Sequence, residues 1–133
     1  MKPKIINVLY VDDEENNLKS FRAAFRRDFN VFTAISAKEA EGILDAENDI
    51  HILITDQRMP LKSGTELLAE SVRKYPYQIR ILLTAYADVE CLEQAINIGH
   101  VHRFLKKPWD DAKLKEEIEE GYDVFVMKKK KRN

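Results

Sequence analysis

Short apolar runs alternate with helical patterns along the whole chain. Five runs rich in β-branched residues predict buried strands, at 5–11, 31–35, 51–55, 79–83 and 101–105. Between these runs, apolar residues recur at the spacing of an amphipathic helix, as Leu18, Phe21 and Phe25 do within about 15–28. Alternating strands and helices predict an α/β fold with a parallel sheet, right-handed connections and helices on both faces.

Several predicted helices begin with side chains that can accept hydrogen bonds from free backbone amides. The pairs Ser36–Glu39 and Ser63–Glu66 have the spacing of capping boxes. A fourth helix is predicted over about 88–99, and Asp110 is placed to cap the last helix. In the loop before Ser63, Gly64 is expected to supply backbone freedom at the helix start.

Composition narrows the class of protein. The chain has 133 residues, 44% of them hydrophobic and 34% charged, which predicts one folded domain rather than disorder. The net charge of -1 gives no reason to expect nucleic acid or an anionic membrane as a partner. With a single cysteine, no long apolar stretch and no apolar signal segment, we expect a soluble cytoplasmic protein without membrane insertion.

Polar residues gather where the predicted strands end. They are three carboxylates, one hydroxyl and at least one ammonium: Asp12, Asp13, Asp56, Thr84, and Lys106 or Lys107. Ligands bind at the carboxyl edge of an open parallel sheet, so these side chains are expected to form one site. Carboxylates close together require a cation, and an all-oxygen ligand set favours Mg²⁺ over zinc. A carboxylate beside such a metal can serve as a nucleophile for a phosphoryl group.

Four segments carry a resemblance to a known family: VLYVDDE (8–14), ILITDQRMPLKSG (52–64), ILLTAYAD (81–88) and RFLKKPWD (103–110). In this order they resemble the receiver domain of two-component response regulators, over about residues 4–122. The resemblance implies a flavodoxin-like (βα)5 doubly wound fold. Chemotaxis receivers are a standard example of this fold, so the strand order is implied by the resemblance.

The resemblance also implies roles for the acidic residues. Asp56 corresponds to the phosphoacceptor, and Asp13 to a direct ligand of Mg²⁺. Asp12 would act beside Asp13, directly or through a water. The third protein ligand of the family is the main-chain carbonyl two residues after the acceptor, which here belongs to Arg58.

The remaining implied roles concern the last two strands. Thr84 would bond a phosphoryl oxygen, and Lys107 would pair with the phosphoryl group, with a cis bond to Pro108. Lys106 is then a solvated surface charge, because neighbours on a strand point to opposite faces. When Thr84 moves toward the phosphoryl group, the aromatic switch residue Phe104 would fill the space it leaves.

Two bulky residues border the implied site. Arg58 follows Asp56 by two residues, and Tyr86 follows Thr84 by two. We expect both to hinder the hydrolytic water and so to prolong the aspartyl phosphate. The alternative is that both side chains simply point to solvent. His51, His100 and His102 lie at strand beginnings on the opposite edge, where we expect ordinary polar or packing residues.

The implied partners are those of a signalling switch. The phosphodonor would be a sensor histidine kinase or a phosphotransfer protein. The signal would pass through the face of the fourth helix, fifth strand and fifth helix to an effector, to a fused output domain or to a second copy of the chain. Trp109 belongs to a stretch that receivers joined to metal-dependent phosphohydrolases often share. No DNA-binding element follows the last helix, so no direct contact with nucleic acid is expected.

Residues 1–122 are predicted to form the receiver, and 123–133 a helical extension or a basic linker. Two other functions remain open at this stage. A magnesium-dependent phosphohydrolase would need an acid/base Asp where the chain has Arg58. A pseudo-receiver would not need the intact set of Asp13, Asp56, Thr84 and Lys107.

Overall fold

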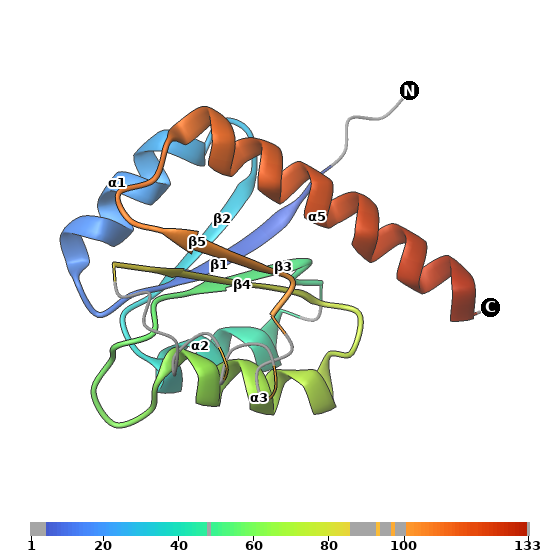
Figure 1. The fold of residues 1–133 in the computed structure, drawn as a ribbon, viewed down its shortest axis with the longest axis horizontal. Coiled ribbons are helices and arrows are strands. Elements are labelled where there is room, and N and C mark those ends of the chain that lie inside the picture. The colour runs from blue at the N-terminus through green and yellow to red at the C-terminus, as the bar shows by residue number, and fades with distance from the viewer. Residues whose placement is uncertain (1–4, 48, 86–92, 94–96, 98–100, 133) are drawn as a thin grey trace.

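The computed structural model describes residues 5–47, 49–85, 93, 97 and 101–132. A five-stranded parallel sheet in the order β2-β1-β3-β4-β5 forms its centre (Figure 1). The strands are β1 (Asn7–Val11), β2 (Asn30–Ala34), β3 (Ile52–Thr55), β4 (Ile79–Thr84) and β5 (Arg103–Lys106). The predicted doubly wound α/β architecture is therefore confirmed.

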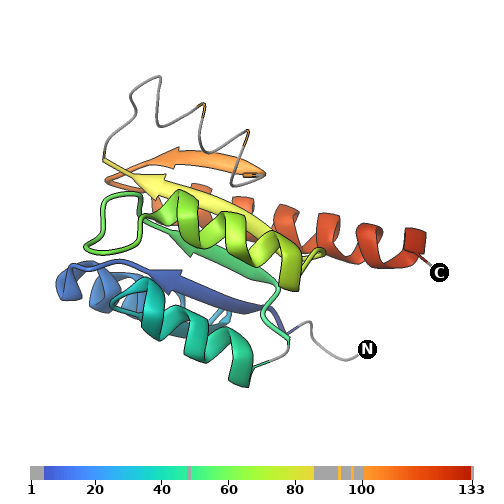
Figure 2. The ribbon, with the colours of Figure 1, turned by 90° about the horizontal axis from the view of Figure 1, so that it is seen from below.

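Helices cover both faces of the sheet. Those described are α1 (Glu15–Phe25), α2 (Ala37–Ala46), α3 (Gly64–Lys74) and α5 (Asp111–Arg132). The helices α1 and α5 lie on one face, and α2 and α3 on the other (Figures 1 and 2). The fourth helix predicted at 88–99 falls outside the described residues, apart from positions 93 and 97. In the part of the chain that is described, no helix has the length and apolar character needed to cross a membrane.

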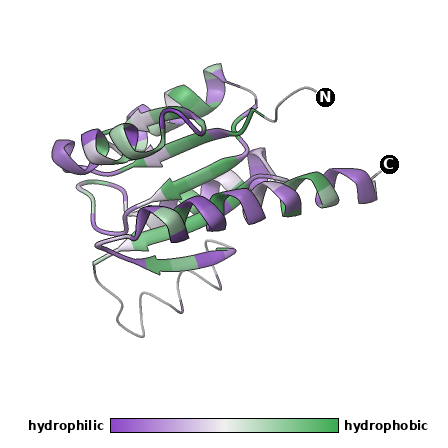
Figure 3. Cartoon of the chain, turned by 90° about the horizontal axis from the view of Figure 1, so that it is seen from above, coloured by the Kyte–Doolittle hydropathy of each residue, from purple (hydrophilic) through white to green (hydrophobic). Residues whose placement is uncertain are grey.

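Alternation along the strands divides the core into two clusters. On β1, Val8 and Tyr10 pack toward α1 and α5, whereas Leu9 and Val11 pack toward α2 and α3. Apolar residues line the strands between the helix layers, and polar residues dominate the outside of α5 (Figure 3). The alternation continues for the residue just after a strand, so a side chain at that position points to the same face as the side chain two residues before it.

Some element boundaries differ from the sequence predictions. The first strand begins at Asn7, and Ile5 is exposed. The first helix ends at Phe25 instead of near residue 28, because the chain turns there and the amide of Asp28 donates to the carbonyl of Phe25. The last strand is Arg103–Lys106, shifted from the predicted 101–105. These shifts are of at most three residues and leave the strand order unchanged.

The two predicted capping boxes have different outcomes. Ser63 and Glu66 form a complete box at the start of α3. At α2, the Ser36 side chain accepts from the amide of Glu39, but the Glu39 carboxylate accepts from the amide of Ile35 instead of that of Ser36. Asp110 caps α5 as predicted, accepting from the amide of Ala112 at 2.9 Å.

Two of the described glycines, Gly64 and Gly121, lie where a side chain would meet neighbouring atoms. None of the described glycines has a positive φ, and Leu61 in the loop before α3 adopts φ 71° instead. The expectation of backbone freedom at Gly64 is therefore wrong. A Cβ at Gly64 would lie 2.2 Å from the carbonyl oxygen of Asp56, so glycine is required for close approach of the two backbones.

The last helix runs without a break past residue 122 to Arg132. Gly121 lies in its middle and is buried, and a Cβ there would come within 3.2 Å of Ile52 and Ile79. The missing side chain lets α5 approach the sheet closely. Of the two forms considered for 123–133, the structure has the helical one through Arg132, and the division of the chain at 122 remains a prediction.

Candidate functional site

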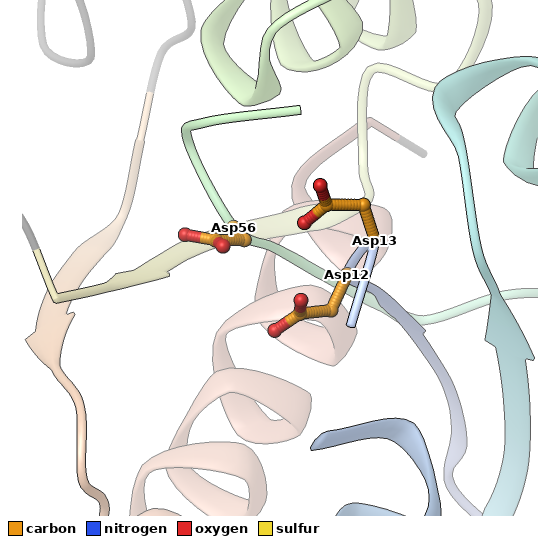
Figure 4. A group of neighbouring side chains, drawn as sticks. All are labelled: Asp12, Asp13 and Asp56. Carbon is orange, nitrogen blue, oxygen red and sulfur yellow. The ribbon is translucent and has the colours of Figure 1, made fainter. Parts of the chain in front are cut away.

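Three carboxylates meet at the carboxyl edge of the sheet. Asp12 and Asp13 follow β1 and Asp56 follows β3; the amide of Asp56 donates to the carbonyl of Val11 at 2.9 Å. One carboxylate oxygen from each residue can be chosen so that all three lie within 4.8 Å of one another. Figure 4 shows the three side chains pointing to the same side of the strand ends. We call Asp12, Asp13 and Asp56 the acidic pocket.

The pocket combines buried and accessible carboxylates. Asp12 is fully buried and Asp56 is 8% exposed, whereas Asp13 is exposed. Burying charged oxygen atoms requires charged or hydrogen-bonding partners. The side chains that face Asp12 and Asp56 therefore decide how the pocket is stabilised.

Lys107 is the cation of the pocket. Its Nζ lies 2.5 Å from Asp12 Oδ2 and 3.1 Å from Asp56 Oδ2. The Lys107 amide donates to the Thr84 carbonyl, and the bond to Pro108 is cis. Burial alone would lower the pKa of Lys107, but the hydrogen bond to Asp12 and the charges of Asp56 and Asp12 raise it. Lys106 is exposed, as strand alternation predicted.

Further donors hold the Asp12 carboxylate. Oδ2 accepts from the Tyr10 hydroxyl at 2.6 Å and from Asn17 Nδ2 at 3.1 Å, and Oδ1 accepts from the Glu14 amide at 2.9 Å. Burial and the hydrogen bond to Asp12 raise the pKa of Tyr10, which therefore remains a neutral donor. Neither Tyr10 nor Asn17 was predicted as a site residue. Strand alternation, which places positions 10 and 12 on one face, is a signal that identifies Tyr10.

The loop after Asp56 is anchored on both sides. Asp56 Oδ1 accepts from the Gln57 amide at 2.8 Å, and Gln57 Oε1 accepts from the Thr65 amide at 2.9 Å. Further along, Lys62 Nζ lies 2.8 Å from Glu41 on α2 and 2.6 Å from Glu70 on α3. These contacts tie the acceptor loop to two helices and so restrict the position of Asp56.

The two predicted switch residues share one face of the sheet. Thr84 is fully buried at the end of β4. Phe104 pairs with Leu82 in the β4–β5 ladder and packs, partly buried, against the cluster under α2 and α3. Position 82 lies two residues before Thr84, so the Phe104 ring is on the side of the sheet to which Thr84 points.

Of the two predicted rate-tuning residues, only Arg58 belongs to the described part of the chain. Arg58 is exposed in the loop after Asp56. Tyr86 lies outside the described residues. Participation of the Arg58 carbonyl in metal binding remains a prediction.

Comparison with known proteins identifies the family. Residues 8–119 match the response regulator receiver domain. This chain belongs to that family. The receiver is 30% identical over 122 residues to the hydrogenase transcriptional regulatory protein HoxA of Bradyrhizobium diazoefficiens, covering 92% of this chain and 25% of HoxA. It is 35% identical over 118 residues to the transcriptional regulatory protein FixJ of Rhizobium meliloti, covering 87% of this chain and 56% of FixJ.

A solved structure agrees with this assignment. The signal receiver domain of an HD domain-containing protein from Pseudomonas fluorescens Pf-5 superposes with a TM-score of 0.89 at 28% identity, covering 93% of this chain and 99% of that one. The receiver thus corresponds to the whole of that domain, whereas it spans a quarter of HoxA and about half of FixJ.

The acidic pocket of the receiver fits a hard divalent cation. Its potential ligands are carboxylate oxygens, which Mg²⁺ prefers. Among the described residues, the Lys107 ammonium pairs with Asp12 and Asp56, and Asp13 adds a third carboxylate, so negative charge remains in excess at this edge. Asp13 is exposed and therefore accessible to an entering ion.

Proposed function

We propose that this receiver takes a phosphoryl group onto Asp56 from a histidine kinase or a phosphotransfer protein, with Mg²⁺ as cofactor. The observation that supports this most directly is the acidic pocket itself. Asp56 shares Lys107 with Asp12, and ligand oxygens from all three aspartates lie within 4.8 Å of one another. Bound Mg²⁺ would neutralise charge on the carboxylates and on the phosphoryl oxygens.

The transfer is an in-line displacement at phosphorus. An Asp56 carboxylate oxygen attacks, the bond from phosphorus to the donor's imidazole nitrogen breaks, and its electron pair stays on that nitrogen. Lys107, already 3.1 Å from Asp56 Oδ2, is placed to pair with the incoming phosphoryl oxygens. Asp12, Asp13 and the Arg58 carbonyl are the proposed Mg²⁺ ligands, with Asp56 as the third carboxylate.

The proposed output is a population shift between two packed states. Thr84 would turn its hydroxyl toward the phosphoryl group, and Phe104 would move into the vacated space. Phe104 has no hydroxyl, so its inward state is stabilised by packing alone. The change would pass to a partner through the face of the predicted fourth helix, β5 and α5.

The identity of the output is a further part of the proposal. HoxA and FixJ are named as transcriptional regulatory proteins, and the Pseudomonas receiver belongs to an HD domain-containing protein. We infer that this receiver controls either a fused output domain or a separate effector. Pairing of two copies through the β5–α5 face is the second arrangement that fits a receiver.

Intact mass measurement tests the acceptor. Incubation with acetyl phosphate and Mg²⁺ should add one phosphoryl mass to the wild type and none to Asp56→Asn. Asp45→Asn, which changes an exposed carboxylate on α2, is the matched control and should be phosphorylated normally. No gain in the wild type, with acetyl phosphate or with a panel of histidine kinases, would favour a pseudo-receiver.

The lifetime of the phosphoryl group tests the rate-tuning residues. We propose that the side chains of Arg58 and Tyr86 restrict the hydrolytic water. Arg58→Asn and Tyr86→Glu should then lose the phosphoryl group several-fold faster than the wild type in a decay measured by mass. Unchanged decay in both variants would mean that the two side chains only face solvent, and slower decay would contradict the proposed role as well.

A further inference from the structure

Tyr10 is a buried tyrosine directed at the acidic pocket from beneath. It is the second-last residue of β1, is fully buried, and donates a hydrogen bond from its hydroxyl to Asp12 Oδ2 at 2.6 Å. Its ring stacks on Phe21 of α1 with centroids 4.5 Å apart, and it meets Trp109 edge-on at 5.9 Å. The ring is thus held between α1 and the segment after β5, so the hydroxyl has a fixed direction.

The Asp12 carboxylate depends on its donors. Asp12 is fully buried, and its Oδ2 accepts from Tyr10, Asn17 and Lys107 at once. Lys107 supplies the positive charge among these three. A buried carboxylate that loses its cation is strongly destabilised unless other donors remain.

Lys107 must leave Asp12 for the receiver to act as proposed. Its Nζ lies between Asp12 and Asp56, where it opposes an incoming cation and occupies the Asp56 oxygen nearest to it. A lower free-energy cost of separating Lys107 from Asp12 therefore favours binding of Mg²⁺ and of a phosphoryl group. The cost of that movement depends on the donors that stay with Asp12.

We propose that Tyr10 is a positioning residue that keeps the Asp12 carboxylate satisfied and oriented when Lys107 departs, and that it thereby promotes Mg²⁺ binding. This inference rests on the proposed function of the acidic pocket. Tyr10 acts through Asp12, because its hydroxyl bonds Asp12 Oδ2 and it contacts no other member of the pocket in the hydrogen-bond network of the described residues. Without the hydroxyl, Asp12 would rely more on Lys107, which would compete more strongly with Mg²⁺.

Mg²⁺ titration of Tyr10→Phe tests the proposal. Phe retains the ring that stacks on Phe21 and removes only the hydroxyl. Affinity is measured by calorimetry and by the fluorescence of Trp109, the single tryptophan of the chain, which contacts Tyr10. Loss of a partner that orients a metal-binding carboxylate typically weakens metal binding by 10–100-fold, so we expect the dissociation constant to rise by about tenfold.

A second background separates this role from a general packing defect. In Lys107→Met the competing ammonium is absent, so adding Tyr10→Phe should weaken Mg²⁺ binding by a clearly smaller factor than in the wild type, because only the orientation of Asp12 is then lost. Tyr75→Phe is the matched control, because the Tyr75 hydroxyl donates at 2.8 Å to Asp45, an exposed carboxylate of α2. It should bind Mg²⁺ as the wild type does.

Each outcome has one meaning. Unchanged or tighter binding in Tyr10→Phe, or an equal loss with and without Lys107, overturns the role of Tyr10 while leaving the acidic pocket intact. Absence of Mg²⁺ binding in the wild type overturns the proposed function instead, and with it the premise of this inference.

Discussion

The two edges of the sheet hold ionisable side chains in opposite charge states: charged at the carboxyl edge and neutral at the amino edge. At the carboxyl edge, the acidic pocket keeps three carboxylates together with one ammonium. At the amino edge, His51 Nδ1 accepts a hydrogen bond from the backbone amide of Asn7 at 2.9 Å, and His102 Nδ1 accepts one from the backbone amide of Arg80 at 3.1 Å. Each of these bonds links the start of one strand to its neighbour.

The histidines are held neutral by their surroundings. Burial, partly offset by Asp49, lowers the pKa of His51. Burial, with the nearby charges of Lys128, Arg80 and Arg103, lowers the pKa of His102 to about 4. His51 also packs edge-on against Tyr122 and Phe125 of α5, and His102 accepts a hydrogen bond from the Arg80 amide, so both are the ordinary polar or packing residues that were expected. His100 lies outside the described residues.

The carboxyl edge can change its charge state, whereas the histidines of the amino edge serve to hold neighbouring strands together. Excess negative charge at the carboxyl edge can be relieved only by binding a cation or by protonation. Neutral rings at the amino edge satisfy backbone donors and leave no charge to neutralise. Changes at the first edge should therefore respond to Mg²⁺, and changes at the second should respond to acid.

The largest predicted effect concerns the backbone beneath the pocket. Gly64→Ala should lower the free energy of unfolding by about 2–3 kcal/mol, because its Cβ would lie 2.2 Å from the Asp56 carbonyl oxygen, which belongs to rigid backbone. Urea unfolding measures the change. Gly42→Ala in α2 is the control, since nothing lies within 4 Å of its Cβ, and it should be neutral or stabilising by up to about 1 kcal/mol. Equal effects at the two glycines would contradict the close approach.

The second prediction tests the response of the carboxyl edge to Mg²⁺. Lys107→Met should destabilise the protein by about 1–2 kcal/mol without Mg²⁺, since buried Asp12 loses its cation while remaining partly compensated by other donors. Saturating Mg²⁺ should narrow the deficit, because the ion supplies the missing charge. A deficit of the same size in both conditions would argue against a cation site at this edge.

The third prediction tests the response of the amino edge to acid. His102 is protonated below about pH 6.5 when unfolded but only below about pH 4 when folded, so its contribution to stability is lost as the pH falls between these values. His102→Asn keeps an acceptor for the Arg80 amide without this titration. Between pH 7 and pH 4 it should lose roughly 1 kcal/mol less stability than the wild type, allowing for partial exposure. Parallel stability curves would refute the assignment.

The smallest predicted effect concerns an exposed ion pair. Arg103 Nε lies 2.8 Å from Glu117 Oε2 and joins β5 to α5, with the arginine side chain 44% exposed. Arg103→Met should change the free energy of unfolding by less than about 0.5 kcal/mol, because solvent screens such pairs. Thermal unfolding at low and high salt provides the measurement. A loss comparable to that of Lys107→Met would mean that burial is not what distinguishes the two ion pairs.

Strand and helix order follow from local patterns in the sequence. Runs such as 52–55 are buried on both faces and read as strands without tertiary information, and polar residues directly after them mark the carboxyl edge. The same reasoning placed Asp12, Asp56 and one of the two lysines, Lys106 or Lys107, at one site. The choice of Lys107 over Lys106 came from the family resemblance, which puts the site lysine directly before Pro108; alternation along the strand only places the two lysines on opposite faces.

The partners within the site were decided only by tertiary structure. Lys107 and Asp12 are separated by 95 positions in the sequence, so their contact cannot be predicted from the local spacing of residues. The donors that surround Asp12 come from β1, α1 and the segment after β5, so its environment exists only once these elements pack. The role of Gly64 likewise depends on how closely two backbones approach. Periodicity determines which face a side chain takes, but packing between distant segments determines what it meets there.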